Sequence, residues 1–147
     1  FPVGCIIAGG EGVLAGGSRS SSSGKAPGEI DHAEINALRN LEAREQESGV
    51  LDRSELTVYV TLEPCLMCFG AILISGIHHI VYGLEDIMGG GTGCRRDILP
   101  PLYRDRQIRI TPGVMRQESL HLLQTFFREP ENTYLKDSLL AQAILNA

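Results

Sequence analysis

The stretch Val60-Thr61-Leu62-Glu63-Pro64-Cys65-Leu66-Met67-Cys68 passes from a β-rich run to two cysteines three residues apart. A helix that begins near Pro64 would place Cys65 and Cys68 on one face of its first turn. Proline suits the first helical position, because its missing N–H would have had no intrahelical partner there. The helix dipole and the free N–H groups at that end favour thiolate over thiol. The stretch therefore predicts a buried strand followed by two sulfur ligands that point in the same direction.

A second chemical group, His32-Ala33-Glu34, lies a few tens of residues upstream, before an amphipathic segment. A catalytic zinc needs three nitrogen or sulfur ligands and an open fourth position for water. Zinc lowers the pKa of bound water to about 7, and a carboxylate beside the ligands can accept that proton. We therefore predict Zn²⁺ as the cofactor, with His32, Cys65 and Cys68 as its ligands and Glu34 as the catalytic acid–base.

Glu34 and the CxxC pair are also compatible with roles other than catalysis. Asp31-x-x-Glu34 also fits a capping box, in which Glu34 only reaches back to a backbone N–H. A lone CxxC can be redox-active or half of a structural zinc ribbon, and a structural module would need a fourth ligand such as Cys94, Cys5 or His79. A catalytically inactive partner subunit of an enzyme complex is a further alternative, and the intact Glu34 argues against it. The two motifs together favour a catalytic zinc.

Length and composition predict a single domain over residues 1–147. The chain is long enough to bury a core, and 43% of its residues are hydrophobic. No apolar run reaches membrane-spanning length, and no signal peptide opens the sequence. The four cysteines do not form a disulfide framework, and this usage fits a reducing cytoplasm.

The charge distribution is uneven. The net charge of −5 argues against a broad nucleic-acid surface. The segment 93–116 nevertheless carries six arginines against two aspartates, a local charge of +4. Its arginines are Arg95, Arg96, Arg104, Arg106, Arg109 and Arg116. This segment is either a solvated loop with a strand edge or a patch for phosphate or an RNA backbone.

Periodicity and turn residues predict alternating strands and helices, which is typical of α/β layers. The predicted strands cover residues 3–8, 13–16, 57–62, 80–82 and 107–111. The predicted helices cover residues 33–48, 65–75, 117–127 and 134–146. A serine-rich loop at 18–28 and a glycine-rich crossover at 85–93 separate some of these elements. Both zinc motifs thus fall at helix starts, where α/β folds usually build their sites.

Residues 32–39 and 60–68 resemble the cytidine-deaminase-like superfamily, and most closely its tRNA-specific adenosine deaminases. Weaker similarity extends over residues 1–4, 81–83, 91–93 and 110–113 and covers most of the chain. The resemblance implies a three-layer α-β-α fold around a mixed five-stranded sheet. The family's usual N-terminal helix is expected to be absent, because the sequence starts at the Pro-Val-Gly strand. Residues 130–147 would then form a C-terminal helical extension.

The resemblance also implies a substrate pocket. Val3 would line it, and the backbone of Ala33 would contact the base. A gapless match puts Arg19 where the tRNA adenosine deaminases have a base-holding Asn, whereas a shift of one residue would put Ser18 there. The backbone N–H of Cys65, at the helix start, is expected to help stabilise the developing oxygen charge.

The implied activity is hydrolytic deamination of a nucleobase amino group, most similar to tRNA adenosine-to-inosine deamination. The missing Asn and the non-basic tail at 129–147 keep a free base, nucleoside or nucleotide of the guanine, cytidine or dCMP type as the alternative substrate. A non-catalytic structural zinc module is the remote alternative. The apolar terminal helix and the resemblance both predict a homodimer, and no membrane partner is expected.

Overall fold

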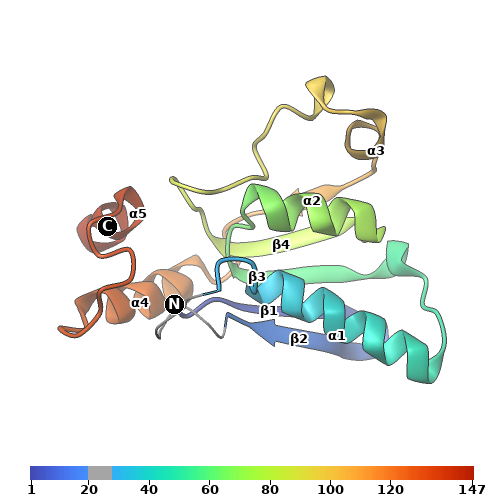
Figure 1. Cartoon of the computed structure of the whole chain (residues 1–147), viewed down its shortest axis with the longest axis horizontal. Helices are drawn as coiled ribbons and strands as arrows, with labels where there is room; N and C mark the ends of the chain where they lie inside the picture. The colour runs from blue at the N-terminus through green and yellow to red at the C-terminus, as the bar shows by residue number, and fades with distance from the viewer. Residues whose placement is uncertain (20–27) are drawn as a thin grey trace.

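The computed structural model describes residues 1–19 and 28–147, so most of the predicted loop at 18–28 lies outside the described residues. The described residues form one five-stranded sheet with helices around it (Figure 1). The strands are β1 (Gly4–Gly9), β2 (Gly12–Ser18), β3 (Thr57–Leu62), β4 (His79–Leu84) and β5 (Arg109–Thr111). The helices are α1 (Ala33–Ser48), α2 (Leu66–Ser75), α3 (Pro101–Arg104), α4 (Arg116–Arg128) and α5 (Leu139–Asn146). Two short 3₁₀ turns, η1 (Arg53–Glu55) and η2 (Arg96–Ile98), complete the elements.

The sheet is mixed, with the strand order β2-β1-β3-β4-β5. β1 pairs antiparallel with both β2 and β3, whereas β3–β4 and β4–β5 are parallel pairs. A parallel pair needs a crossover, and α2 supplies it between β3 and β4. The carboxyl ends of β3 and β4 therefore lie side by side at the edge where α2 begins.

One face of the sheet is covered by α1 and α2. Gly17, Cys5, Val60 and Tyr82 are successive partners across the strands and so share this face. A Cβ on Gly17 would overlap the backbone of Ala33 and Ala37, so a glycine is needed for α1 to lie directly on β2. This close contact fixes the start of α1, and with it His32, against the sheet.

The opposite face is covered in part by α4. A Cβ on Gly83 would overlap Ser119 of α4, and Gly83 alternates with Tyr82 along β4, so α4 lies on the other side. Ile6 and Tyr59 are each 40% exposed, and the β1–β3 part of the sheet is less covered than the α1 and α2 face. These helices and the sheet confirm the predicted α/β fold with a mixed five-stranded sheet.

The predicted terminal helix at 134–146 is wrong at its start. α5 begins at Leu139, because Ser138 caps it by accepting the N–H of Ala141 at 3.1 Å. Before that cap the chain turns, and Leu135 has a left-handed backbone with φ of 53°. The leucine pattern alone did not reveal this cap.

The segment between β4 and β5 was predicted only as a crossover over 85–93. The structure adds η2 and α3, which project beyond α2 as a separate arm (Figure 1). The predicted strand at 107–111 is shorter, and β5 covers only its last three residues. Among the described residues, no helix has the length and apolar character that crossing a membrane requires.

Candidate active site

The cysteine pair lies at the start of α2, but the helix begins later than predicted. Cys65 is the N-cap and Leu66 the first helical residue, so Pro64 lies outside the helix. Pro64 instead offers its carbonyl to the N–H of Gly91 at 2.8 Å. Cys68 lies in the first turn and is fully buried. The prediction that both cysteines lie within the first turn is therefore wrong for Cys65, although both residues lie at the start of α2.

His32 is the N-cap of α1 and faces these sulfurs. Its Nδ1 lies 3.5 Å from Sγ of Cys65 and 3.5 Å from Sγ of Cys68. All three ligand atoms lie within 4.8 Å of one another. Tetrahedral zinc with Zn–S of about 2.3 Å and Zn–N of about 2.0–2.1 Å would separate nitrogen from sulfur by about 3.6 Å. The three side chains therefore fit a tetrahedral zinc site.

The two thiols are coupled to each other and to the imidazole. A hydrogen bond from Cys68 lowers the pKa of Cys65 to about 4, and His32 acts in the same direction. The same sulfur–sulfur contact, together with burial, raises the pKa of Cys68. The hydrogen bond with Cys65 also raises the pKa of His32. A thiolate at Cys65 is the form that binds a metal.

Glu34 lies in the first turn of α1 and is 4% exposed. Burial raises the pKa of its carboxyl group. The capping-box interpretation is not supported, because the N-cap is His32 and makes no side-chain cap bond. The Asp31 carboxylate instead accepts from Arg39 at 2.8 Å. Glu34 is thus a buried carboxylate beside the ligands and outside the ligand group.

No fourth His, Cys, Asp or Glu joins the three ligands among residues 1–19 and 28–147. Cys5 is buried in the core. The ring of His79 is engaged by Thr111, 2.9 Å from its Nε2, and by Arg109, 2.9 Å from its Nδ1. The fourth ligand that a structural zinc module requires is therefore not found in the described part of the chain.

Glu63, two residues before Cys65, forms hydrogen bonds to the glycine-rich segment after β4. The Glu63 carboxylate accepts the N–H groups of Asp86 and Thr92, each at 3.2 Å, and also the Thr92 hydroxyl. A Cβ on Gly90 would overlap this carboxylate, so a glycine is needed for the close approach. This loop forms one wall beside the ligands.

A cavity of about 220 Å³ opens above the ligand group. Val3, Arg19 and Ala33, the residues expected at the substrate, all line it, as do Glu34 and Cys65. Sequence reasoning missed several other lining residues, namely Phe1, Glu29, Leu62, Glu63, Asp86, Met88, Gly89, Tyr134, Leu135 and Leu140. The last three come from the C-terminal segment, whose leucine spacing indicated only a packing role.

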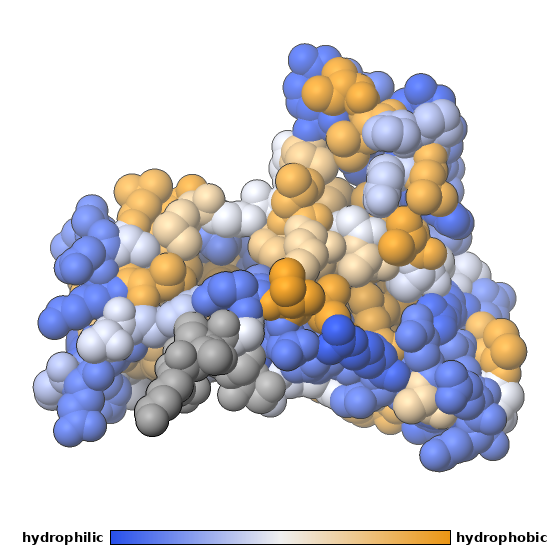
Figure 2. Space-filling view, viewed as in Figure 1, coloured by the Kyte–Doolittle hydropathy of each residue, from blue (hydrophilic) through white to orange (hydrophobic). Residues whose placement is uncertain are grey.

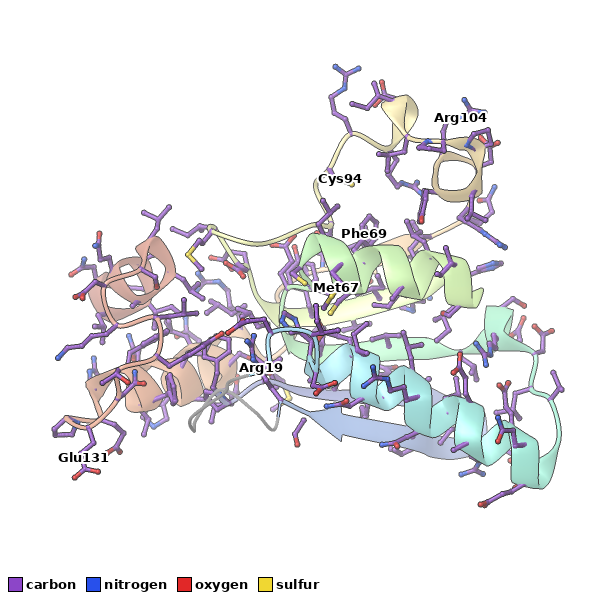
Figure 3. The ribbon with its side chains drawn as sticks, viewed as in Figure 1. Arg19, Met67, Phe69, Cys94, Arg104 and Glu131 are labelled. Carbon is purple, nitrogen blue, oxygen red and sulfur yellow. The ribbon has the colours of Figure 1, made fainter. Side chains whose placement is uncertain are left out.

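Arg19 crosses from β2 toward that segment (Figure 3). Its side chain is 6% exposed. Nη1 lies 3.1 Å from Nε2 of His32, and Nη2 donates to Glu29 at 2.7 Å and to the Tyr134 hydroxyl at 2.5 Å. The guanidinium also lies 5.1 Å from the ring centroid of Tyr134, within cation–π range.

Comparison with known proteins agrees with this geometry. Residues 1–84 match the family described as the cytidine and deoxycytidylate deaminase zinc-binding region. The chain belongs to this family. It is therefore a zinc-dependent deaminase, as the resemblance predicted, and its His/Cys/Cys group could hold a metal ion.

Similar proteins include tRNA-specific adenosine deaminases. One from Streptococcus pyogenes serotype M18 is 33% identical over 130 residues, which is 88% of this chain and 78% of that protein. One from Haemophilus influenzae is 41% identical over 98 residues, which is 67% of this chain and 55% of that protein. A solved structure from a study of A-to-I editing by tRNA:A34 deaminases is 28% identical, with a TM-score of 0.64 over 82% of this chain and 83% of that one.

Proposed function

We propose that the protein catalyses the zinc-dependent hydrolytic deamination of a nucleobase, with His32, Cys65 and Cys68 holding the metal. The observation that carries the proposal is that these three ligand atoms lie within 4.8 Å of one another, beside a cavity that His32, Cys65 and the buried Glu34 line. When bound, zinc supplies Lewis-acid activation of water, whose pKa falls to about 7.

The chain's own groups handle the protons. Glu34 takes the proton from water and delivers protons to a ring nitrogen and to the departing amine. The ring carbon gains a C–O bond and loses its C–N bond, so the products are an oxo base and ammonia. We expect the backbone N–H of Cys65, the N-cap of α2, to stabilise negative charge on the new oxygen.

Adenosine in tRNA is the first candidate substrate. The similarity to tRNA-specific adenosine deaminases over most of the chain supports it. We also propose a homodimer and a location in the cytoplasm, the latter because none of the four cysteines forms a disulfide.

The arginine-rich segment is the candidate RNA contact, although ion pairs reduce its charge. Arg95 pairs with Asp97, Arg104 with Asp105, and Arg116 with Glu85. If the segment contacts the RNA backbone, Arg95→Ala with Arg96→Ala should weaken tRNA deamination and flatten the log–log salt slope by about one unit per lost phosphate contact. Arg39→Ala is the matched control, because Arg39 lies on α1, outside the arginine-rich segment, and is likewise paired with an aspartate, Asp31. It should leave tRNA deamination and the salt slope unchanged.

A free base or nucleoside is the second candidate, and the cavity wall favours it. Four carboxylates, those of Glu29, Glu34, Glu63 and Asp86, line the cavity against the single cation Arg19 among the described lining residues. Such a wall repels phosphate groups. The C-terminal segment also closes one side of the cavity with Tyr134 and Leu135.

The deciding experiment measures ammonia release by the zinc-loaded protein from tRNA, adenosine, adenine, guanine, cytidine and dCMP. Turnover of tRNA alone supports the first candidate. Rapid turnover of a small substrate, without tRNA binding at low salt, supports the second. Ammonia from none of them contradicts the proposed function.

A further inference from the structure

The buried side chain of Arg19 has one N–H group without a hydrogen-bond partner among the described residues. A buried guanidinium N–H that lacks an acceptor is costly, so most such groups are paired. Nε of Arg19 is buried and has no hydrogen-bond partner among the described residues, although Nη2 has two. The side chain lines the same cavity as Glu34 and Cys65. An acceptor on a molecule in the cavity would satisfy the unpaired donor.

A second donor of Arg19 needs an acceptor once the metal site is loaded. In this structure Nη1 faces Nε2 of His32 at 3.1 Å. A neutral imidazole that binds a metal through Nδ1 carries its proton on Nε2, so Nε2 can then only donate. Nη1 and Nε would both present N–H groups, and a guanidinium has no acceptor atom of its own. The edge of a base that faces Arg19 must therefore carry acceptors, such as a carbonyl oxygen or an unprotonated ring nitrogen.

Tyr134 holds the guanidinium in this position. Its hydroxyl accepts from Nη2 of Arg19 at 2.5 Å and donates to the Glu29 carboxylate at 3.2 Å. Because Nη2 also donates to Glu29, each of the three side chains is hydrogen-bonded to the other two. Its ring lies under the guanidinium and against Phe1, with the two ring centroids 5.7 Å apart. Glu29 alone would be a weak anchor, because its side chain is 61% exposed and solvent screens the ion pair.

The segment that carries Tyr134 is fixed by its own contacts. The side-chain oxygen of Asn132 accepts the N–H of Tyr134 at 3.0 Å, and its amide donates to the Tyr134 carbonyl at 3.3 Å. The next residue, Leu135, has the left-handed backbone described above and lines the cavity. Such a conformation persists only where the surrounding structure imposes it.

We propose that Tyr134 is a positioning residue of the base-binding pocket, which with Glu29 fixes Arg19 so that its guanidinium donates to an acceptor edge of the base. The proposal rests on the proposed deaminase function and adds to it. It assigns the C-terminal segment to the substrate site.

Equilibrium binding of deamination products tests this proposal, since products are not turned over. The probes are hypoxanthine, xanthine, uracil and an RNA stem–loop carrying inosine at the wobble position, with the zinc-loaded protein. Tyr134→Phe keeps the ring and removes the hydroxyl, and Tyr59→Phe, on the half-exposed face of β3, is the matched control. We expect Tyr134→Phe to weaken binding of the preferred probe about tenfold, with zinc content and melting temperature equal to those of Tyr59→Phe.

The two residues should also act as one unit. In an Arg19→Met background, Tyr134→Phe should cause no further loss of binding, because its only proposed role is to hold the guanidinium. Equal binding by Tyr134→Phe and Tyr59→Phe, or full additivity with Arg19→Met, would overturn the proposal, as would a wild-type protein that binds none of the probes. Probe binding that depends on Tyr134, without ammonia from the amino forms of the same bases, would instead contradict only the proposed function.

Discussion

Glu34 is the residue whose role is most sharply defined by its position. It is buried, it lines the cavity, and it lies outside the ligand group. Glu34→Gln should reduce turnover by about 10²–10⁴-fold or more, because the amide cannot carry the proton. The zinc content and the melting temperature of Glu34→Gln should stay close to those of the wild type. The control is Glu42→Gln, an exposed residue on the same helix, and it should change neither turnover nor zinc content. An unfolded variant that keeps its activity per folded molecule would instead favour the capping role.

Cys65 should differ from Glu34, because it is a ligand. Cys65→Ala should lose zinc as well as activity, since two remaining ligands hold zinc poorly. Metal analysis by mass spectrometry should give about one zinc per chain for the wild type and close to none for the variant. Cys94→Ala, which changes a thiol outside the ligand group, should retain its zinc. Full zinc content in Cys65→Ala would contradict the ligand assignment.

Single residues were predictable where chemistry restricts the residue type. His32, Cys65 and Cys68 have the types and spacing of zinc ligands, and the structure brings them together. Tyr134 was not predictable, because a lone tyrosine in a polar stretch gives no signal of the 115-residue separation across which it contacts Arg19.

Elements were predictable where their caps and periodicity agree. α1 has the predicted bounds, because its apolar stripe and Gly49 mark the same range. α2 and α5 begin later than predicted, since Cys65 and Ser138 serve as N-caps. The arm with η2 and α3 has no strong periodicity, and its short elements could not be recognised in the sequence.

Glu45 joins three elements and gives a pH-dependent prediction. Its carboxylate accepts from Arg53 and from the N–H of Leu51, and Arg53 also donates to the Ser75 carbonyl at the end of α2. The hydrogen bond from Arg53 lowers the pKa of Glu45 below its ordinary value of 4.5. The stabilisation is therefore present above about pH 4.5 and is lost as the pH falls through the lowered pKa.

Glu45→Gln should accordingly lower the free energy of unfolding at pH 7 by about 1 kcal/mol, allowing for solvent screening. Denaturant unfolding at several pH values measures this difference. The difference in the free energy of unfolding between Glu45→Gln and the wild type should narrow below pH 4.5. The exposed Glu47→Gln should show no such difference. A gap that is constant down to acidic pH would show that the charge of Glu45 has no part in it.

At the scale of the whole molecule, exposed apolar side chains lie on α2 as well as on the terminal helix, where Leu139 is 56% and Leu145 39% exposed. α5 buries Leu140, Ala141 and Ile144, and it packs on α4. On α2, Leu66 is 60% and Ile74 50% exposed, beside a groove that continues to Leu99 and Tyr103. Figure 2 shows apolar atoms gathered on this side, between the C-terminal helices and the projecting arm.

The proposed homodimer should therefore depend on α2. Ile74→Lys should convert the dimer to a monomer, because it places a charge in an apolar contact. Val50→Lys, at a residue that is 90% exposed, is the control that should leave the dimer intact. Light scattering at micromolar concentration measures both. A wild-type monomer, or a dimer unaffected by Ile74→Lys, would contradict this surface as the interface.

The central claim is hydrolysis of a base at the cavity formed by the two helix starts, and oxygen-18 water tests it most directly. Turnover by the zinc-loaded protein in H₂¹⁸O should give one ammonia and one ¹⁸O-labelled base product by mass spectrometry for each substrate consumed. The label should sit on the carbon that lost its amino group, and Glu34→Gln should release neither product above background. Ammonia without label in the base, or labelled product at an undiminished rate from Glu34→Gln, would contradict the account.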